Sequence, residues 1–415
     1  MALPHAVIAG AGIGGLTSAL SLAEAGWQIS LYEKANILEE TGAGLQLSPN
    51  ASAILRQLGV LQRLSPFALA PQTIRIRRAR DGETLALLPL FDAEARWGAP
   101  YLVVHRADLQ RALLERLALN KSIRLVTGTA VTGFVSGKEG VRVTLAGSEA
   151  FIEEKGDCLI GADGLRSFVR QKLAEDPLQF SGRTAWRTLI EVQRVEAQRV
   201  RPMMQSPEVH LWLGHRAHLV HYPLRGGTVI NVVAIVEENF RPEGEEFWSC
   251  PGDPEFLQMR FAGFAAEARD LLAAAREWRK WPLAVRDCAP HFAVGRIALI
   301  GDAAHPMLPF LAQGAAQAIE DAAALGALLR PGQDIEAGLS AYEAARRPRA
   351  LRVQRESRRQ GRIYHLGGTA AFLRDLALRA LPSEQWLARY DWLYGVKEWP
   401  SNRADNFSIG PARKG

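Results

Sequence analysis

Three glycines near the N-terminus stand at a spacing that suits binding of a pyrophosphate. Gly10, Gly12 and Gly15 form a G-x-G-x-x-G pattern between the short apolar run 6–9 and an Ala/Leu-rich stretch over 16–25, so they are predicted to join a strand to a helix. In such a turn the first glycine permits the bend, the second admits a pyrophosphate to the backbone, and the third allows close packing. The start of the helix adds amide donors and a positive dipole.

An acidic residue strengthens this interpretation. Glu33 lies eighteen residues beyond Gly15, at the end of the next predicted strand over 28–32. At that place a carboxylate can accept a hydrogen bond from a ribose hydroxyl. The alternative is an ordinary strand-to-helix turn, because glycine-rich turns are common. The turn by itself does not choose between NAD and FAD.

A second constellation lies near residue 300. Asp302 follows an apolar run over 296–300 that is predicted to be a buried strand. Its carboxylate could bind a polyol such as a ribityl chain. The amides near Gly314 and Ala315, at the start of a predicted helix, could stabilise negative charge on a flavin N1/C2 carbonyl. His305 lies in the intervening loop and is interpreted either as a base or as a residue that fixes the loop.

A third motif, Asp163-Gly164, follows a predicted buried strand at 159–161. Alone it would be equally consistent with a surface turn. Together the three motifs resemble those of the single-component flavoprotein aromatic hydroxylases. They occur in the order of that family and are spread over most of the chain.

Finer matches narrow the resemblance. The segment 105–109 resembles the family's segment whose arginine, here Arg106, contacts the FAD pyrophosphate. The segments 186–187, 218–223 and 312–314 are similar to the branch that contains salicylate 1-hydroxylase, 3-hydroxybenzoate 6-hydroxylase and 6-hydroxynicotinate 3-monooxygenase. The resemblance covers roughly residues 5 to 395, including Tyr364-His365, and the last twenty residues carry no family signal.

The resemblance implies an FAD-dependent monooxygenase that hydroxylates a small phenolic or hydroxy-N-heteroaromatic acid. NAD(P)H would reduce FAD, and O2 would add at the flavin C4a position to give the hydroperoxide that hydroxylates the substrate. Asp163 and Gly164 would also assist the nicotinamide, which is expected to bind transiently because the chain has no second G-x-G-x-x-G. The expected cofactor-binding residues are Gly10, Gly12, Gly15, Glu33, Lys34, Arg106, Asp163, Gly301, Asp302, Pro309, Gln313, Gly314 and Ala315.

The expected catalytic residues lie on one predicted strand over 217–223. His218 and Tyr222 share a face of that strand, roughly 13 Å apart, and could flank an aromatic ring, whereas His221 faces the other way. A histidine with a pKa near 6.5 is a suitable base for a phenolic proton, and the family implies that this pair acts on the substrate hydroxyl. The alternative for His218 is a satisfied strand histidine. No metal is expected, since no carboxylate or cysteine completes a ligand set with His210, His215, His218 and His221.

Two arginines are candidates for a substrate carboxylate. The fork of Arg187 or of Arg225 would match a carboxylate bidentately, with Gln313 as a further substrate contact. Either arginine could equally form a surface ion pair.

Composition excludes several classes of protein. The 415 residues are 48% hydrophobic and 23% charged, which excludes disorder, collagen and a membrane bundle. No apolar run reaches the roughly 18 residues of a membrane span. Cys158, Cys250 and Cys288 lie far apart and indicate neither a disulfide framework nor a zinc site, so a cytoplasmic protein is expected.

The net charge of +6 comes from one segment. Residues 346–362 contain eight arginines and one acid, which gives +7 and leaves −1 for the remainder. Arg352, Arg355, Arg359 and Arg362 recur at helical spacing, which favours one solvated or domain-facing helix stripe. Nucleic acid is not an expected partner, because the segment lacks interleaved aromatics.

The predicted fold class is α/β. A Rossmann-like FAD-binding domain over 1–180 and 281–335 would contain an inserted, mostly β-sheet substrate domain over 181–280, with a hairpin turn at Gly226-Gly227. A helical region over 336–415 would follow. A monomer or a homodimer is expected, with a small aromatic substrate and O2 as partners.

Three rival functions remain open at this point. One is a flavoenzyme of the same fold with another outcome, such as an epoxidase, a urate-type hydroxylase or a reductase. Another is an NAD-dependent dehydrogenase, against which Gly301-Asp302 argues. The third is a non-catalytic nucleotide-binding protein whose partner surface would be the arginine stripe. A yellow protein that oxidises NADH would exclude the last two.

Overall fold

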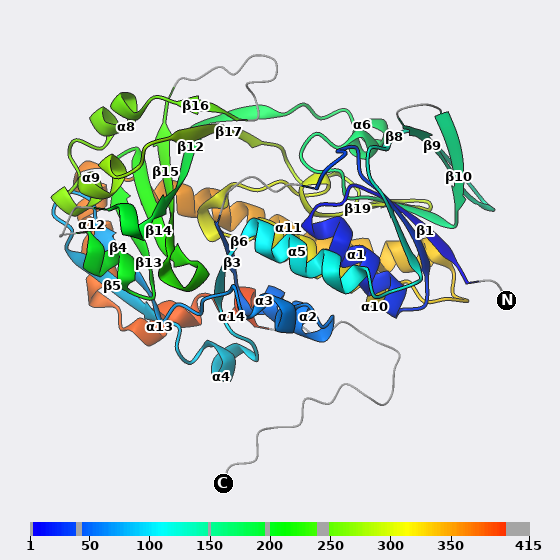
Figure 1. The fold of residues 1–415 in the computed structure, drawn as a ribbon, viewed down its shortest axis with the longest axis horizontal. Helices are drawn as coiled ribbons and strands as arrows, with labels where there is room; N and C mark the ends of the chain where they lie inside the picture. The colour runs from blue at the N-terminus through cyan, green and yellow to red at the C-terminus, as the bar shows by residue number, and fades with distance from the viewer. Residues whose placement is uncertain (1–2, 39–43, 148–150, 196–199, 239–248, 396–415) are drawn as a thin grey trace, which may run out of the picture.

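Two large β-sheets lie at opposite ends of the molecule, with long helices between them (Figure 1). The computed structural model describes residues 3–38, 44–147, 151–195, 200–238 and 249–395. Because the sheets come from interleaved parts of the chain, segments far apart in sequence meet in the middle of the molecule.

The first sheet has six strands in the order β18-β19-β11-β1-β2-β7. These are β18 (Ala293–Val294), β19 (Ile297–Leu299), β11 (Cys158–Gly161), β1 (His5–Ala9), β2 (Gln28–Tyr32) and β7 (Ile123–Val126). All neighbours are parallel except β18, which pairs antiparallel with β19. Parallel strands covered on both faces read as continuous apolar runs, and β1 and β11 are almost entirely buried.

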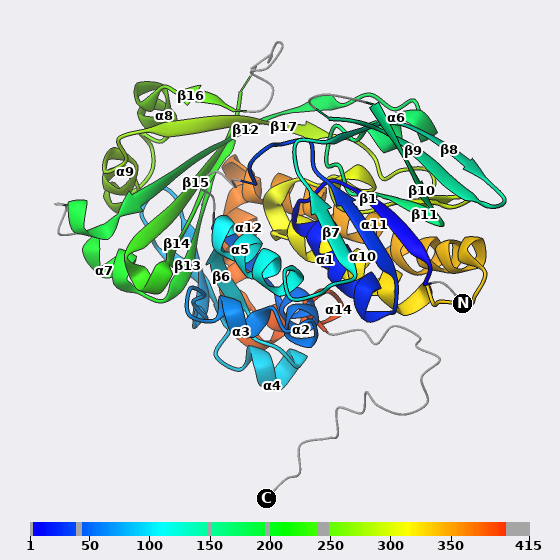
Figure 2. The ribbon, with the colours of Figure 1, turned by 45° about the vertical axis from the view of Figure 1, so that its right-hand side comes forward.

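Helices α1 (Ile13–Glu24), α5 (Arg106–Leu117), α10 (Gly314–Leu328) and α11 (Ile335–Tyr364) pack against this sheet and each other (Figure 2). The Ala-rich sequences of α1 and α10 allow a close approach. A Cβ atom on Gly326 would lie 2.7 Å from the carbonyl oxygen of Ser21, so only glycine fits at this crossing.

The second sheet has eight strands in the order β16-β17-β12-β15-β14-β13-β4-β5. They are β16 (Cys250–Gly252), β17 (Trp278–Val285), β12 (Gln179–Glu191), β15 (Val229–Glu237), β14 (Ala217–Leu224), β13 (Glu208–Gly214), β4 (Thr73–Arg78) and β5 (Thr84–Pro89). The expected hairpin turn at Gly226-Gly227 joins β14 to β15. β4 and β5 lie outside the range 181–280 expected for the substrate domain, and β17 extends beyond that range to Val285. β4 pairs with β13, a contact between distant residues that no local pattern records.

The outer face of the eight-stranded sheet is covered by α7 (Arg201–Gln205), α8 (Pro254–Arg260) and α9 (Ala266–Ala273), which enclose a core around Trp186 and Trp212. The inner face looks toward the first sheet and its helices. Side chains alternate along each strand, so His218, Val220 and Tyr222 of β14 lie on the inner face, where Val220 and Tyr222 join the inner clusters.

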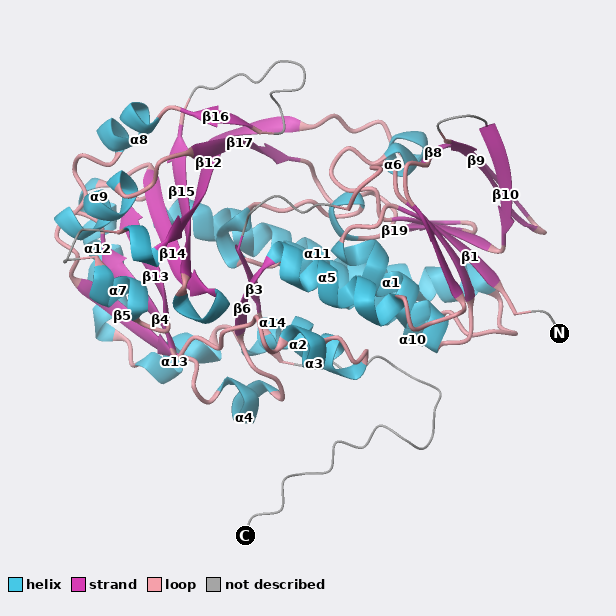
Figure 3. Ribbon diagram, viewed as in Figure 1, coloured by secondary structure: helices cyan, strands magenta, loops and turns pink. Residues whose placement is uncertain are grey.

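The remaining elements are two smaller sheets and shorter helices (Figure 3). A three-stranded sheet contains β8 (Ala130–Gly137), β9 (Gly140–Ala146) and β10 (Phe151–Gly156), and a two-stranded one contains β3 (Gly44–Leu47) and β6 (Leu102–His105). The other helices are α2 (Pro49–Gln57), α3 (Leu61–Leu64), α4 (Ala93–Trp97), α6 (Phe168–Leu173), α12 (Gly368–Ala380), α13 (Ser383–Ala388) and α14 (Asp391–Tyr394). Short 3-10 turns are η1 (Val192–Arg194), η2 (Arg225–Gly227), η4 (Gly301–Ala303) and η5 (Pro309–Leu311). None of the helices described is long and apolar enough to cross a bilayer.

The predicted fold class is confirmed, including the helices after residue 335. The boundaries move by a few residues at most: the helix expected at 16–25 begins at Ile13, and the helix expected to start near Gly314 and Ala315 spans Gly314–Leu328. The arginine stripe lies on α11, and Arg352, Arg355, Arg359 and Arg362 are exposed on it. The expectation of a solvated stripe agrees with their exposure.

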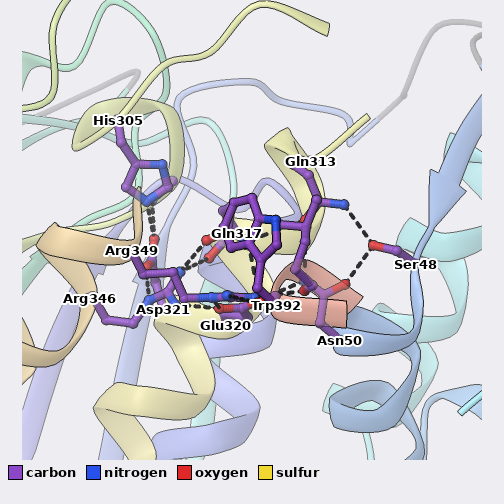
Figure 4. A network of polar contacts seen from close by, with 12 residues as sticks. Ser48, Asn50, His305, Gln313, Gln317, Glu320, Asp321, Arg346, Arg349 and Trp392 are labelled. Carbon is purple, nitrogen blue, oxygen red and sulfur yellow. Dashed lines mark hydrogen bonds and ion pairs between the residues drawn. The ribbon is translucent and has the colours of Figure 1, made fainter. Parts of the chain in front are cut away.

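Two acids of α10 are buried against two arginines of α11 (Figure 4). Arg346 donates to Asp321 from Nε over 2.7 Å and also pairs with Glu320. Arg349 donates to Glu320 from Nε and Nη2 at 2.6 and 2.7 Å. Burial raises the pKa of Asp321, but His305 and Arg346 outweigh it and bring the pKa to about 2. The four charges therefore compensate one another without solvent.

Prediction one follows from this network. Replacing Arg346 by Leu removes the cation that pairs with the buried Glu320 and Asp321. Breaking a buried ion pair in this way lowers the free energy of unfolding by about 3–5 kcal/mol. We expect urea denaturation of Arg346→Leu to show a loss of that size.

The matched control is Arg355→Leu, which removes an exposed arginine from the same helix. A surface change of that kind should stay within about 0.5 kcal/mol of the wild type. Equal stability of Arg346→Leu and Arg355→Leu would contradict the structural role of the network.

Candidate active site

Four strand ends meet at one edge of the first sheet. Gly10 follows β1, Glu33 follows β2, Asp163 comes just beyond β11, and Asp302 comes just beyond β19. These strands are parallel neighbours, so their carboxyl ends point the same way. The strand order also reverses at β1, with β2 on one side and β11 on the other. A crevice at such a point is where open α/β sheets bind their ligands.

The glycine turn has the geometry that its sequence predicts. Gly10 has φ +99°, a conformation that favours glycine. A Cβ atom on Gly15 would lie 1.8 Å from the carbonyl oxygen of Gly10, so helix and strand are packed as closely as the backbone allows. A Cβ atom on Gly12 would have no neighbour within 4 Å. The second glycine therefore faces open space, as it must if a pyrophosphate is to approach.

Glu33 ties the end of β2 to this turn. Its carboxylate accepts from the amide of Ala11 at 2.8 Å and from that of Ala35 at 3.0 Å. Lys34 follows it and is exposed. The carboxylate thus stands beside the glycine turn, at the position expected of a ribose ligand.

Asp163 lies at the entry to α6. One oxygen, Oδ2, accepts from the amide of Val169 at 3.1 Å, whereas Oδ1 is buried and has no hydrogen-bond partner among the described residues. Burial raises the pKa of this carboxyl group. Gly164 has φ +77° and open space around its α-carbon. An unsatisfied buried oxygen beside an open glycine marks a place for a polar ligand group.

Asp302 combines exposure with desolvation. Its side chain is accessible to water, and yet the surrounding protein raises the pKa of its carboxyl group. Many protein atoms therefore surround a carboxylate that water still reaches. Gly301, with φ +56°, donates its amide to Asp321 at 2.9 Å, which fixes the turn that presents Asp302.

The loop before α10 is held from several sides. Pro309 opens the turn η5, and Ala312 has φ +52°, a strained conformation for a residue with a side chain. Gln313 stands at the N-cap of α10 but donates its side chain to Ser48 at 2.7 Å instead of capping the helix. The first amides of the helix, around Gly314 and Ala315, are therefore not covered by a capping side chain.

His305 belongs to the framework of this loop. It is fully buried, and its Nε2 lies 2.5 Å from Oδ2 of Asp321 (Figure 4). Of the two interpretations of His305, the structure supports a residue that fixes the loop.

His218 lies on the inner face of the second sheet, against that same loop. Its ring centroid is 5.5 Å from that of Phe310 in η5 and 5.3 Å from that of Tyr364. Its Nδ1 is 2.8 Å from Nε2 of His365. Burial lowers the pKa of His218 well below its ordinary value, with His365 and Arg183 adding to the effect. The expectation of a pKa near 6.5 is therefore wrong, because the ring is desolvated. His218 is neutral at pH 7.

Tyr222 stands further along the same face. A Cβ atom on Gly44 would lie 2.7 Å from its hydroxyl oxygen, so β3 passes directly over the phenol. Gln46 of β3 accepts from the hydroxyl of Tyr101 at 2.7 Å and also bonds Tyr222. Burial raises the pKa of Tyr222, so its hydroxyl stays protonated at neutral pH.

The two candidate arginines have different surroundings. Arg225 makes a bidentate ion pair with the buried Asp108, at 3.0 and 3.1 Å. Arg187 lies on the inner face, with its guanidinium 5.2 Å from the ring centroid of Trp281 and with Nε buried and making no hydrogen bond within the described ranges. Burial lowers the pKa of Arg187, and the nearby Arg106 at the start of α5 lowers it further. Two positive charges side by side favour an anion between them.

The other histidines of this region do not converge on His218. His210 and His221 stack 4.5 Å apart on the outer face of the sheet, with Arg77 donating to His210. No group of potential metal ligands is found in the part of the chain that the structure describes.

Sequence reasoning did not assign roles to three residues that the structure places at this site. Gln46 bonds Tyr222, Tyr101 donates to Gln46, and His365 contacts His218. His365 is 147 residues from His218 along the chain. Only the resemblance at Tyr364-His365 pointed toward it, since spacing carries no signal over such a distance.

Comparisons with known proteins agree with this geometry. Residues 5–357 match the family model described as FAD binding domain. The chain is 39% identical over 402 residues to a 3-amino-4-hydroxybenzoate 2-monooxygenase of Streptomyces platensis, covering 96% of this chain and 97% of that one. It is 33% identical over 392 residues to a 3-hydroxybenzoate 6-hydroxylase of Polaromonas naphthalenivorans, covering 94% and 95%.

The fold is also that of a solved flavoprotein. The crystal structure of Klebsiella pneumoniae HpxO, complexed with FAD and uric acid, superposes with a TM-score of 0.80 at 26% identity and covers 93% of this chain and 95% of that chain. The open Gly12, the unsatisfied Asp163, the exposed Asp302 and the uncapped start of α10 fit FAD. The chain therefore belongs to the FAD binding domain family and is an FAD-dependent monooxygenase of the aromatic hydroxylase type.

Proposed function

We propose that the substrate is a small aromatic acid with a phenolic hydroxyl or its N-heteroaromatic equivalent, and that the hydroxyl lies at His218 and the carboxylate at Arg187. The observation that carries this proposal is the inner face of the second sheet, where the buried ring of His218 packs against Phe310 of the loop 309–315. On the same face, the half-buried Arg187 keeps a buried Nε without a hydrogen bond among the described residues. A carboxylate and a hydroxyl also occur together in the substrates for which the two curated relatives are named.

In this proposal FAD lies along the edge where the four strand ends meet. Glu33 would hold the adenosine ribose, Gly12 and Arg106 the pyrophosphate, and Asp302 the ribityl chain. Asp163 and Gly164 would assist the phosphates. When bound, FAD takes reducing equivalents from NAD(P)H and activates O2, and the protein supplies orientation, proton transfer and exclusion of water. The described residues contain no second glycine turn of this type, so the nicotinamide would bind transiently.

His218 would act as the base for the phenolic proton. Removing that proton raises the electron density of the ring, which favours attack by an electrophilic oxygen. A base must be unprotonated to act, and burial keeps His218 neutral. Tyr222, which stays protonated, would donate a hydrogen bond to the substrate, and Gln313 would be a further contact.

The setting of the enzyme is part of the same proposal. A cytoplasmic location is supported by three cysteines that are all free in the structure. The proposal allows a monomer or a homodimer and requires no nucleic acid or membrane partner. Size-exclusion chromatography with light scattering measures the oligomeric state.

Prediction two concerns cofactor retention. Glu33→Ala should weaken FAD binding because it removes the ribose acceptor, and Asp302→Ala should yield largely apo protein that is otherwise folded. Flavin absorbance per protein and circular dichroism measure both properties. Arg355→Ala, on the exposed face of α11, is the control and should purify with full flavin. Full flavin content in both site variants would show that the cofactor residues are misassigned.

Prediction three concerns the catalytic pair. His218→Ala and Tyr222→Phe should keep normal FAD content, because the strand-end residues are untouched. Loss of a positioned base costs about a hundredfold to ten-thousandfold in hydroxylation rate. Oxidation of NAD(P)H should continue in part and yield hydrogen peroxide. Raising the pH toward the pKa of the substrate phenol should partly restore His218→Ala, since solvent then removes the proton.

The measurement for this pair is product formed per NAD(P)H consumed, across pH, with 3-hydroxybenzoate and 3-amino-4-hydroxybenzoate as test substrates. Wild-type rate and coupling in both variants would mean that the site lies elsewhere. Loss of FAD would instead assign these residues to the cofactor.

Prediction four separates the two arginines. Hydrogen bonds to charged groups contribute about 1.5–3 kcal/mol, so Arg187→Met should raise KM for a benzoate roughly tenfold to hundredfold. Arg225→Met should change KM much less, because its guanidinium is bound to Asp108. The steady-state KM of each variant is the measurement. A larger effect at Arg225 would transfer the carboxylate to that residue, and equal activity on uric acid and on benzoates would favour a urate-type hydroxylase.

A further inference from the structure

A chain of hydrogen bonds runs from His218 toward the surface. Nδ1 of His218 lies 2.8 Å from Nε2 of His365, and Nδ1 of His365 lies 3.2 Å from Oε1 of Glu237. His218 and His365 are buried, whereas the side chain of Glu237 is 25% exposed. The chain therefore connects the inner face of the sheet to water.

The direction of these bonds follows from chemistry. Burial raises the pKa of Glu237, but hydrogen bonds from His365 and Arg183 outweigh it and lower the pKa, so the carboxylate is ionised and can only accept. Nδ1 of His365 must then carry the hydrogen. A neutral imidazole has one donor and one acceptor, so Nε2 of His365 accepts from Nδ1 of His218. The lone pair of His218 is left at Nε2.

This tautomer matters for the reaction. Within the described part of the chain, Nε2 of His218 makes no hydrogen bond, since the ring's other contacts are with Phe310 and Tyr364. Nε2 of His218, which is not bonded to His365, is therefore the ring nitrogen that can accept a proton.

We propose that His365 and Glu237 form a proton relay that carries the phenolic proton from His218 to solvent. The inference rests on the proposed function, in which His218 is the base. In the transfer, the substrate O–H bond breaks as an Nε2–H bond forms on His218. The Nδ1–H of His218 passes to Nε2 of His365, and the Nδ1–H of His365 passes to Glu237 and then to water. One proton leaves the substrate, one reaches solvent, and no electrons are transferred.

The surroundings explain why a relay is needed. Arg183 and Arg216 both pair with Glu237, at 2.9 and 3.2 Å, and the neighbouring His215 and Arg183 lower the pKa of His365. Burial lowers the pKa of His365 to about 4. A positive charge kept on either ring would therefore be unfavourable, whereas a concerted transfer leaves both rings neutral.

A backbone hydrogen bond fixes the position of His365 relative to the strand that carries His218. His365 is the C-cap of α11, and its carbonyl accepts from the amide of Arg216 at 3.2 Å. Arg216 lies in the turn between β13 and β14 and has φ +58°. The strained turn thus connects the end of α11 to the strand that carries His218.

The test compares two substitutions at one residue. In His365→Gln the amide can still accept from His218 and donate to Glu237, but it cannot exchange protons as an imidazole does. In His365→Ala both bonds are lost. Glu237→Gln provides a second, more exposed position should the buried variants fold poorly. His210→Gln, which removes a buried histidine from the outer face of the same sheet, is the matched control.

The measurement uses holoenzyme with 3-hydroxybenzoate and 3-amino-4-hydroxybenzoate. Proton release on binding is followed without O2 in a rapid-mixing instrument with a pH-indicator dye, and hydroxylation is followed in air across pH. We expect His365→Gln to be as slow as His365→Ala, about tenfold or more below wild type at pH 7. The deficit should shrink as hydroxide becomes available, with FAD content unchanged and His210→Gln like wild type.

Two results would overturn the relay. One is wild-type proton release in His365→Gln together with a slow His365→Ala, which would mean a hydrogen-bonding role alone. The other is wild-type behaviour in His365→Gln and Glu237→Gln while His218→Ala is slow. If His218→Ala itself hydroxylates normally, or the wild type accepts neither compound, the proposed function fails and the relay with it.

Discussion

The common direction of four parallel strands is the constraint on which the site depends. β19, β11, β1 and β2 run side by side, so one edge of the sheet receives Asp302, Asp163, the glycine turn and Glu33. Each residue comes from a different part of the chain, and hydrogen bonding between strands sets their spacing to about 4.8 Å per strand. Backbone geometry thus sets where these strand-end residues lie, whatever ligand their side chains bind.

The second sheet must be held against this edge, and α11 does so. Gln354 donates to the carbonyl of Pro306 at 2.7 Å, and Ser357 donates to that of Leu308. These hydrogen bonds attach the helix to the loop that leads to η5. Nearer the start of the helix, Arg346 binds the acids of α10, and at its end His365 contacts His218. One helix thereby aligns the cofactor loop with the strand that carries the proposed base. The buried ion pairs give this alignment a definite geometry at a high cost of desolvation.

Two of the residues proposed to bind ligands carry a buried polar atom that the described part of the protein does not satisfy. Asp163 and Arg187 each bury an atom without a hydrogen bond in the described structure, and Ala312 has a left-handed backbone. Such features are unfavourable in a resting framework, and in the proposed function a bound ligand would satisfy the two side-chain atoms. By contrast, the guanidinium of Arg225 makes a bidentate pair with Asp108, and Nε2 of His305 bonds Asp321, so these two side chains serve the framework.

The sequence by itself determined the fold class, the three cofactor motifs and the face of the strand shared by His218 and Tyr222, because these depend on local spacing and on side-chain alternation. It did not determine that β4 and β5 join the second sheet, nor that His365 reaches His218, because those contacts join residues more than a hundred positions apart. It also misjudged the pKa of His218, since desolvation depends on what packs around the ring. The tertiary structure alone decided that Arg225 is held by a carboxylate whereas Arg187 keeps a buried Nε without a hydrogen bond among the described residues, because identical guanidinium groups differ only in their neighbours.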